Sequence, residues 1–372
     1  MATREDSPDD DDGRASAAVA ELYHAWFTAL ILTLIGRRDA ALAERFVFTV
    51  FRRQHLAKFL PGLAKLGLAD APDAVAAASY HYYSNQLGGV RVELFVESPR
   101  KAWVRYPPPR WIWSGTAIAA VPTEVNRAML RAWHAHNGVS LNNPRLGFVC
   151  TKTTTDGQPG LEGYYLEHDR ELAPEERLRF APDESCPPID PATLPALDAD
   201  AWPEARRRKA SRNYAMEYLR TGLPVLVELL GAEDGGAVGA LSARLTGMHF
   251  IDAALATLGL TIPVVSGADR PGLAATAAAF ARAFAAMATA QGDEVRIEEQ
   301  ASVLRITQRG WRLAHGMAHA DAAGVEAVAS AWNGLWAGAL SAVNRHLQWH
   351  SVTRRGTGAD TTFVWEIRVG PG

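Results

Sequence analysis

The side chains best suited to chemistry gather in the first half of this 372-residue chain. The segment SYHYYSNQLGG spans residues 79–89, whereas the corresponding segment of the second half, AFARAFAAMAT at 279–289, is almost entirely apolar. WHAHNG at 133–138 likewise corresponds to an alanine-rich run in the second half. Imidazole, phenol and amide groups can transfer protons and bind polar ligands. We therefore expect any small-molecule site to lie in the first half.

Two histidines are candidates for acid or base chemistry. His136 falls on the apolar stripe of a helix predicted from Pro122, whereas His134 and Arg127 face outward on the same helix. A neutral imidazole at His136 or at His81 could activate water, because its usual pKa lies near neutrality. The alternative is that both are hydrogen-bonded core histidines.

Cys150 is the third catalytic candidate, on a predicted inner strand with the sequence GFVCTK. Lys152 lies two residues further on, and alternate residues share a strand face. A nearby ammonium group would lower the pKa of the thiol and favour the nucleophilic thiolate. The alternative is a small cysteine buried in the core.

Six residues are predicted to bind the substrate. Arg105 and Lys152 would hold a carboxylate, and Asn85 or Asn137 would stabilise developing negative charge. The full predicted set is Arg105, Lys152, Asn85, Asn137, Tyr82 and Trp111.

No cofactor or metal is predicted. Histidine pairs four residues apart occur in the second half, at His315 and His319 and at His346 and His350, and this spacing puts ligands on one face of a helix. Neither pair has the adjacent glutamate of a zinc protease, so a metal-dependent enzyme is only an alternative. The chain also lacks a phosphate-binding loop and a GxSxG nucleophile motif.

The elements that would position these residues occur twice along the chain. Helices, an extended pair, a helix and a hairpin run from about residue 15 to 170 and recur from about 211 to 372. An acidic tail, 1–14, is predicted to be disordered, and 171–210 forms a proline-rich linker. The predicted fold is α+β, in two similar halves, each a helical layer on an antiparallel sheet of two hairpins joined by a helix. The first half would carry the site and the second would be scaffold.

The composition and charge of the chain indicate which partners and which cellular location to expect. The net charge is −3 and no basic stripe with aromatics occurs, so nucleic acid is not expected as a partner. The apolar stretch AWFTALILTLIG is too short to span a bilayer, so no membrane association is expected. Two cysteines do not require a disulfide framework, which favours the cytoplasm. A homo-oligomer is compatible with all of this.

The order of elements, together with segments such as FVCTK and TFVWEIRV, resembles the L-2-amino-thiazoline-4-carboxylic acid hydrolase-like family in tandem. That family opens a small heterocycle by hydrolysis, so the resemblance implies a hydrolase of a C–N bond in a small carboxylated or cyclic substrate. The layout is also similar to ligand-binding sensor domains of the 4-vinyl-reductase and haem-nitric-oxide type. A non-catalytic binding or sensor protein is therefore the main alternative.

Overall fold

The computed structural model describes residues 8–108, 121–263, 265–267, 269–300, 303–315, 321–356 and 360–369, without the side chains of 8–11 and 300. The chain divides into two units by its internal contacts. The first unit comprises Leu34–Ser211, and the second comprises Met1–Thr33 together with Arg212–Gly372.

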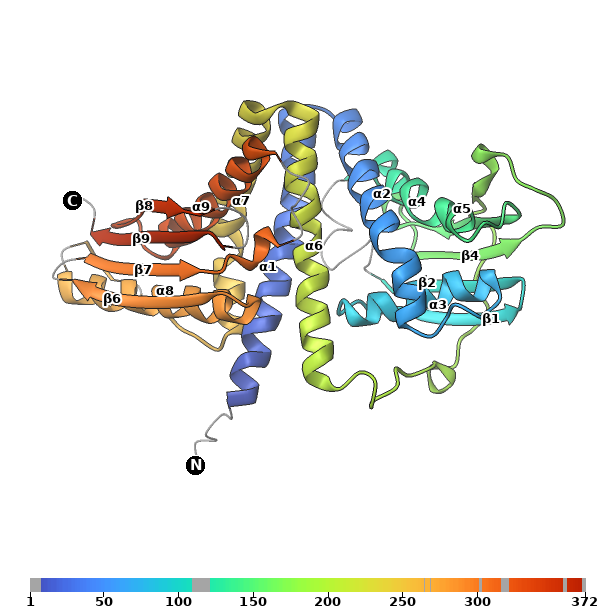
Figure 1. Ribbon diagram of the computed structural model, residues 1–372, viewed down its shortest axis with the longest axis horizontal. Coiled ribbons are helices and arrows are strands. Elements are labelled where there is room, and N and C mark those ends of the chain that lie inside the picture. The colour runs from blue at the N-terminus through green and yellow to red at the C-terminus, as the bar shows by residue number, and fades with distance from the viewer. Residues whose placement is uncertain are drawn as a thin grey trace. The chain divides into compact units, whose positions relative to one another are not determined.

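The first unit is a helical layer on a mostly antiparallel sheet, so the predicted α+β class is confirmed. Its helices are α2 (Ala40–Lys65), α3 (Asp73–Leu87), α4 (Thr123–Ala132) and the short α5 (Asn137–Ser140). Its strands are β1 (Glu93–Ser98), β2 (Lys101–Tyr106), β3 (Leu146–Lys152), β4 (Leu161–Glu167) and β5 (Leu178–Phe180). They are ordered β1-β2-β4-β3-β5, with antiparallel neighbours except for the parallel pair β3 and β5. Helices α2, α3 and α4 lie along this sheet (Figure 1).

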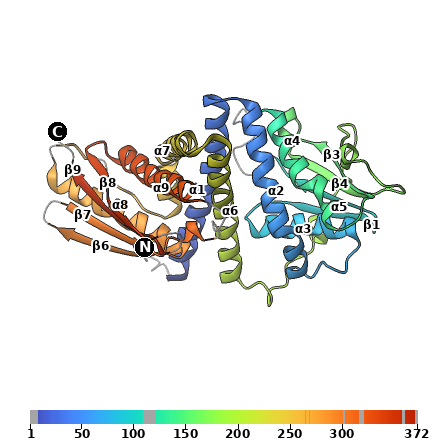
Figure 2. The same cartoon turned by 45° about the horizontal axis from the view of Figure 1, so that its top comes forward.

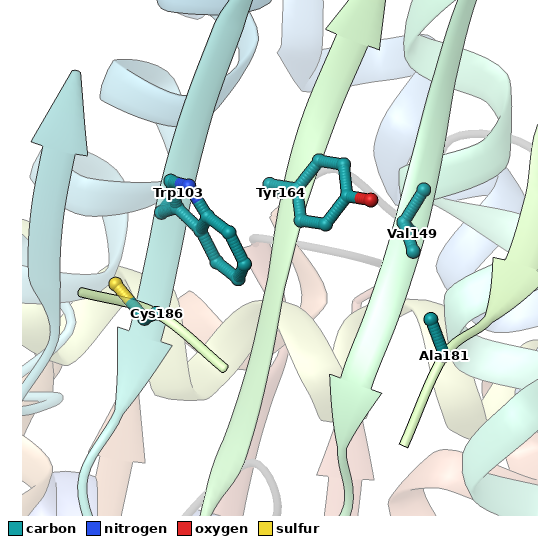
Figure 3. Packing of buried hydrophobic residues seen from close by; sticks show 5 residues of the cluster. All are labelled: Trp103, Val149, Tyr164, Ala181 and Cys186. Carbon is teal, nitrogen blue, oxygen red and sulfur yellow. The ribbon is translucent and has the colours of Figure 1, made fainter. Parts of the chain in front are cut away.

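The proline-rich segment after β4 packs on the same unit. It supplies β5 and then Ala181 and Cys186, which form a buried cluster with Trp103, Val149 and Tyr164. Figure 3 shows Trp103, Tyr164 and Val149 on the three neighbouring strands β2, β4 and β3. Alternation along β3 and β4 therefore gives Val149 and Tyr164 to this face, whereas Phe148 and Tyr165 face the helices.

The second unit has the same strand order. Its helices are α1 (Pro8–Arg37), α6 (Glu204–Leu230), α7 (Ala232–Thr257), α8 (Arg270–Gln291) and α9 (Ala322–Val343), with α1 and α6 each continuing into the first unit. Its strands are β6 (Glu294–Gln300), β7 (Val303–Arg309), β8 (Leu347–Arg355) and β9 (Thr362–Val369), ordered β6-β7-β9-β8. Helix α8 runs along this sheet (Figure 2). In both sheets the second strands of the two hairpins are neighbours: β2 lies beside β4, and β7 lies beside β9. The internal duplication of the chain stays a prediction.

Helix α1 differs from the expectation in its start and in its unit. It begins at Pro8, so residues 8–14, predicted to be disordered, are helical. The helix was expected to open the first half, but most of it belongs to the second unit, where the Tyr23 hydroxyl donates to Gln291 Oε1.

Among the described residues, two helices are long and apolar enough to cross a membrane, at residues 12–37 and 270–291. About half of the apolar window of each is buried inside the protein. Buried core helices have the same length and composition, because they too are apolar on most sides.

Candidate functional site

Five buried polar side chains form one hydrogen-bonded group in the first unit. We call this group the histidine core; it consists of His55 from α2, His81 from α3, His134, Asn137 from α5 and Tyr165 from β4. None is more than 4% exposed. Three histidines with so little exposure are costly to bury unless they bond to one another, so their bonds decide what they do.

The Asn137 amide joins the histidine core. Its Oδ1 accepts from His55 Nε2 at 3.0 Å, and its Nδ2 donates to Tyr165 Oη at 2.8 Å and to His81 Nε2 at 3.2 Å. The Tyr165 hydroxyl then donates to His134 Nδ1 at 2.7 Å. The Asn137 amide assigns the proton of His55 to Nε2 and that of His81 to Nδ1. The ring of His81 stacks on that of His134, with centroids 4.1 Å apart.

Burial keeps these imidazoles neutral. It lowers the pKa of His55 and that of His134 to about 3, and it lowers the pKa of His81 well below its usual value. Neighbouring histidines add to the effect, because a positive charge on one opposes protonation of the next. Neutral imidazoles of this kind can relay hydrogen bonds but cannot hold an anion by charge.

The two histidines of WHAHNG, His134 and His136, have the reverse of their predicted orientations. Helix α4 ends at Ala132, and residues 134–136 form a single 3-10 turn. The tighter turn changes the angle between successive side chains, so His134 points into the core and His136 is half-buried. The prediction that His136 faces inward and His134 outward is therefore wrong. His136 still packs edge-on against His55, with ring centroids 5.1 Å apart, and burial lowers its pKa to about 4.

A cavity of about 210 Å³ lies at the end of β3, which we call the Cys150 cavity. Its polar lining comes from Arg127 on α4 and from the segment that runs through Cys150, Thr151, Thr153, Asp156 and Gln158. Phe180 and Pro182 complete the wall. Phe148 touches His134, and Cys150 follows two residues later on the same strand face. Strand β3 therefore carries both a side chain that packs against the histidine core and the cysteine of the cavity.

Opposite charges face one another in the Cys150 cavity. The Arg127 guanidinium lies 3.6 Å from the Asp156 carboxylate and stacks over the Phe180 ring at 4.7 Å. Its Nε is buried without a hydrogen-bond partner among the described residues. Thr123 donates to the Asp156 carboxylate, and the Thr153 hydroxyl accepts from the Asp156 backbone N–H at 3.2 Å. The Asp156 carboxylate is thus held in place beside the Arg127 guanidinium.

The Cys150 thiol is not arranged as a nucleophile. Burial, and then the Asp156 carboxylate, raise its pKa to about 12, so the thiolate is scarce at neutral pH. A β-bulge between Cys150 and Lys152 breaks the alternation that would have put both on one face. The Lys152 ammonium donates instead to the carbonyls of Pro182, at 2.5 Å, and Glu184, at 2.9 Å. Cys186 is also a buried free thiol.

Three of the predicted substrate-binding residues are engaged within the first unit. Arg105 pairs with the buried Glu93 at 2.5 Å, so it does not face an open anion site. Asn85 donates to the His81 carbonyl at 2.7 Å and to Tyr106 Oη at 3.2 Å. Lys152 bonds to carbonyls, as described above. Each of the three thus has partners within the unit, and a role in binding a substrate stays a prediction for all of them.

The remaining predicted residues lie in different places. Asn137 and His81 meet in the histidine core. Tyr82 points away from it and donates to the Pro195 carbonyl at 2.8 Å. Trp111 lies outside the described residues.

Sequence reasoning missed His55, Arg127 and Asp156. Arg127 was placed on the outer face of its helix, and its cavity forms only because β5 returns beside β3. A local signal existed in TKTTTDGQ at 151–158, where short polar side chains follow Cys150 without interruption. Such residues commonly bond to backbone in tight turns, and here Thr153 does so.

The histidine pairs of the second half do not form a metal site among the described residues. His350 lies on β8 and His346 directly before it, so this pair does not have the helical geometry that a shared metal would need. His350 instead bonds to Gln348 at 3.1 Å. His319 of the other pair lies outside the described residues, and His315 Nδ1 bonds to Arg312 at 2.8 Å.

The second unit has a buried polar group of its own. Asp293 accepts from the side chains of Gln291 and Gln308 and from the Arg312 backbone N–H at 2.6 Å. Trp332 in turn donates to Gln308 at 3.1 Å. Burial raises the pKa of Asp293 to about 6, against the lowering effect of these hydrogen bonds. Buried polar residues are therefore not confined to the first half.

No protein-family model, curated protein or solved structure matches this chain.

Proposed function

We propose that the first unit binds a small zwitterionic molecule, carrying one carboxylate and one amino group, in the Cys150 cavity. The observation that carries the proposal is the juxtaposition of the Arg127 guanidinium and the Asp156 carboxylate, 3.6 Å apart on the wall of one cavity. A guanidinium binds carboxylate through two parallel hydrogen bonds. The neighbouring Asp156 would accept from the ligand's ammonium group.

The size of the cavity limits the ligand. Its volume of about 210 Å³ equals the share of roughly seven water molecules, at about 30 Å³ each. An amino acid or a five-membered ring carboxylate has this size. The Phe180 ring and Pro182 would contact the ligand's apolar side.

Hydrolysis of a C–N bond in such a ligand is the second candidate function. It is favoured by Asp156, a carboxylate in the same cavity that could accept a proton from an attacking water. Cys150 would then line the cavity as a neutral thiol, since its raised pKa opposes nucleophilic attack. The histidine core would hold β3 and the turn after α4 in position without touching the substrate.

Binding can be tested by calorimetry with thiazolidine-4-carboxylate, and with thiazolidine as the matched probe that lacks the carboxylate. We expect only the carboxylate to bind. Arg127→Gln should weaken it at least about tenfold, because a hydrogen bond to a charged group contributes about 1.5–3 kcal/mol. Arg131→Gln is the control, since Arg131 lies on the same helix, pairs with Glu44 and does not line the cavity.

Equal loss of affinity in the two variants, or equal binding of both probes, would show that Arg127 does not recognise a carboxylate. The hydrolase candidate needs a separate readout. Incubation with 2-amino-thiazoline-4-carboxylate should yield a product heavier by one water molecule, and Asp156→Asn should abolish its formation. Binding without any product would support the non-catalytic function and dismiss hydrolysis of that compound.

A further inference from the structure

A second, larger cavity of about 570 Å³ lies in the first unit, between the end of α3 and the residues around the start of α6. We call it the α3 cavity. Tyr82 and Gln86 line it from α3, Leu194 and Leu197 from the proline-rich segment, and Arg207 and Ser211 from α6. The bond from Tyr82 Oη to the Pro195 carbonyl ties the proline-rich segment to α3. The wall is thus formed by segments more than a hundred residues apart.

The lining of the α3 cavity combines apolar side chains with positive charge. Leu87, Leu194 and Leu197 are apolar lining residues, and Arg207 and Arg208, at consecutive positions of α6, also line the cavity. None of the lining residues is acidic. Arg208 pairs with Glu204 at 3.3 Å, whereas Arg207 has no ion pair with any residue in the described part of the chain. The cavity therefore presents positive charge without a matching acid on its wall.

Volume and chemistry together indicate the class of ligand. Ligand pockets commonly measure roughly 300–1,000 Å³ and combine an apolar lining with a few polar groups that fix orientation. A guanidinium beside aliphatic side chains suits a carboxylate on a hydrocarbon body. The Cys150 cavity differs in both respects, since it is smaller and contains Asp156.

We propose that the α3 cavity is a binding site for a small amphipathic anion, such as a medium-chain carboxylate, with Arg207 holding the acid group and Leu194 and Leu197 contacting the chain. This site is separate from the Cys150 cavity and does not depend on the function proposed there. Tyr82, a predicted substrate-binding residue, would shape this second site, because its hydroxyl positions the segment that carries both leucines.

Titration calorimetry of the full chain with octanoate, and with octylammonium of the same chain length, tests the charge preference. We expect octanoate to bind and octylammonium not to bind. Arg207→Glu should weaken octanoate at least about tenfold, because it replaces a charge-assisted hydrogen bond by repulsion. Lys209→Glu is the matched control: it makes the same charge change at an exposed position of the same helix that does not line the cavity. It should change the affinity less than about twofold.

A second variant tests the location independently of charge. Ala196 lines the cavity at an exposed position, so Ala196→Trp should fill the space without disturbing the core and should also weaken octanoate. The proposal is overturned if octanoate does not bind, if octylammonium binds equally well, or if Arg207→Glu and Lys209→Glu have equal effects. It is also overturned if Ala196→Trp, folded as judged by its thermal unfolding, leaves the affinity unchanged.

Discussion

The histidine core should make the first unit less stable in mild acid. The substitution His134→Gln should remove about half of the loss of stability that His55 and His134 cause together. Their folded pKa of about 3 lies below the ordinary value of about 6.5 in the unfolded chain. Between these values the unfolded chain binds protons that the folded chain does not. Stability is therefore full above the unfolded pKa and decreases as the pH falls towards the folded pKa.

The size of the effect follows from the difference in proton binding. At about pH 5, an imidazole with an unfolded pKa of about 6.5 favours the unfolded chain by roughly 2 kcal/mol relative to about pH 8. His55 and His134 are 0% and 3% exposed, so solvent screens neither, and together they contribute roughly 4 kcal/mol. The lowered pKa of His81 acts in the same direction.

Urea unfolding at these two pH values, followed by tryptophan fluorescence, measures the loss in the wild type and in His134→Gln. Glutamine can still accept the hydrogen bond from Tyr165 but cannot be protonated. The variant should therefore lose roughly 2 kcal/mol less than the wild type on acidification. His350→Gln, outside the histidine core, should leave the difference unchanged. An equal loss in His134→Gln and wild type, or an imidazole of His134 that titrates near its ordinary pKa in NMR spectra, would refute the reasoning.

Three further predictions concern single residues. Cys150 and Cys186 should resist alkylation by iodoacetamide at about pH 8 until the protein unfolds, because burial raises the pKa of each to about 12; rapid labelling of the native protein would restore the nucleophile hypothesis. Tyr23→Phe should lower the free energy of unfolding of the second unit by about 1–2 kcal/mol, because Gln291 loses a buried hydrogen-bond donor. A double-mutant cycle with Gln291→Met should show an interaction energy between the two side chains, and additive effects would contradict the hydrogen bond. Gly163→Ala should lower the free energy of unfolding in denaturant by about 1–3 kcal/mol, because a Cβ there would meet the Val149 carbonyl and the Phe148 ring. Gly36→Ala is the control: open space surrounds Gly36, so the substitution should not destabilise the helix.

The elements of the fold could be predicted because their signals are local. The extended pair and the hairpin predicted between residues 15 and 170 are the hairpins of β1 with β2 and of β3 with β4. The order of the strands in the sheet, the parallel β5 and the unit to which α1 belongs depend on contacts between distant residues. Periodicity carries no information about such contacts.

The site was harder to predict for the same reason. The helical period was extended from Val125 to His136, but the helix ends at Ala132, so the positions of both nearby histidines were reversed. His55 follows Arg52, Arg53 and Gln54 in α2 and gave no signal of its own, because its bond is to Asn137, 82 residues later. A β-bulge displaced Lys152 from Cys150, and one extra residue in a strand leaves little trace in sequence.

The first half of the sequence is more polar than the second, but each unit contains a buried polar contact at a similar place in its fold. In the first unit, Asn85 near the end of α3 bonds to Tyr106 at the end of β2. In the second unit, Asp293 directly after α8 bonds to Gln308 near the end of β7. In the first unit the bond joins α3 to the second strand of the first hairpin, and in the second unit it joins the short connection between α8 and β6 to the corresponding strand. This position closes the helical layer onto the sheet in both units, so a buried polar contact there serves the fold. The polar residues that distinguish the first unit are then the histidine core and the charged wall of the Cys150 cavity, and function is best sought at that cavity.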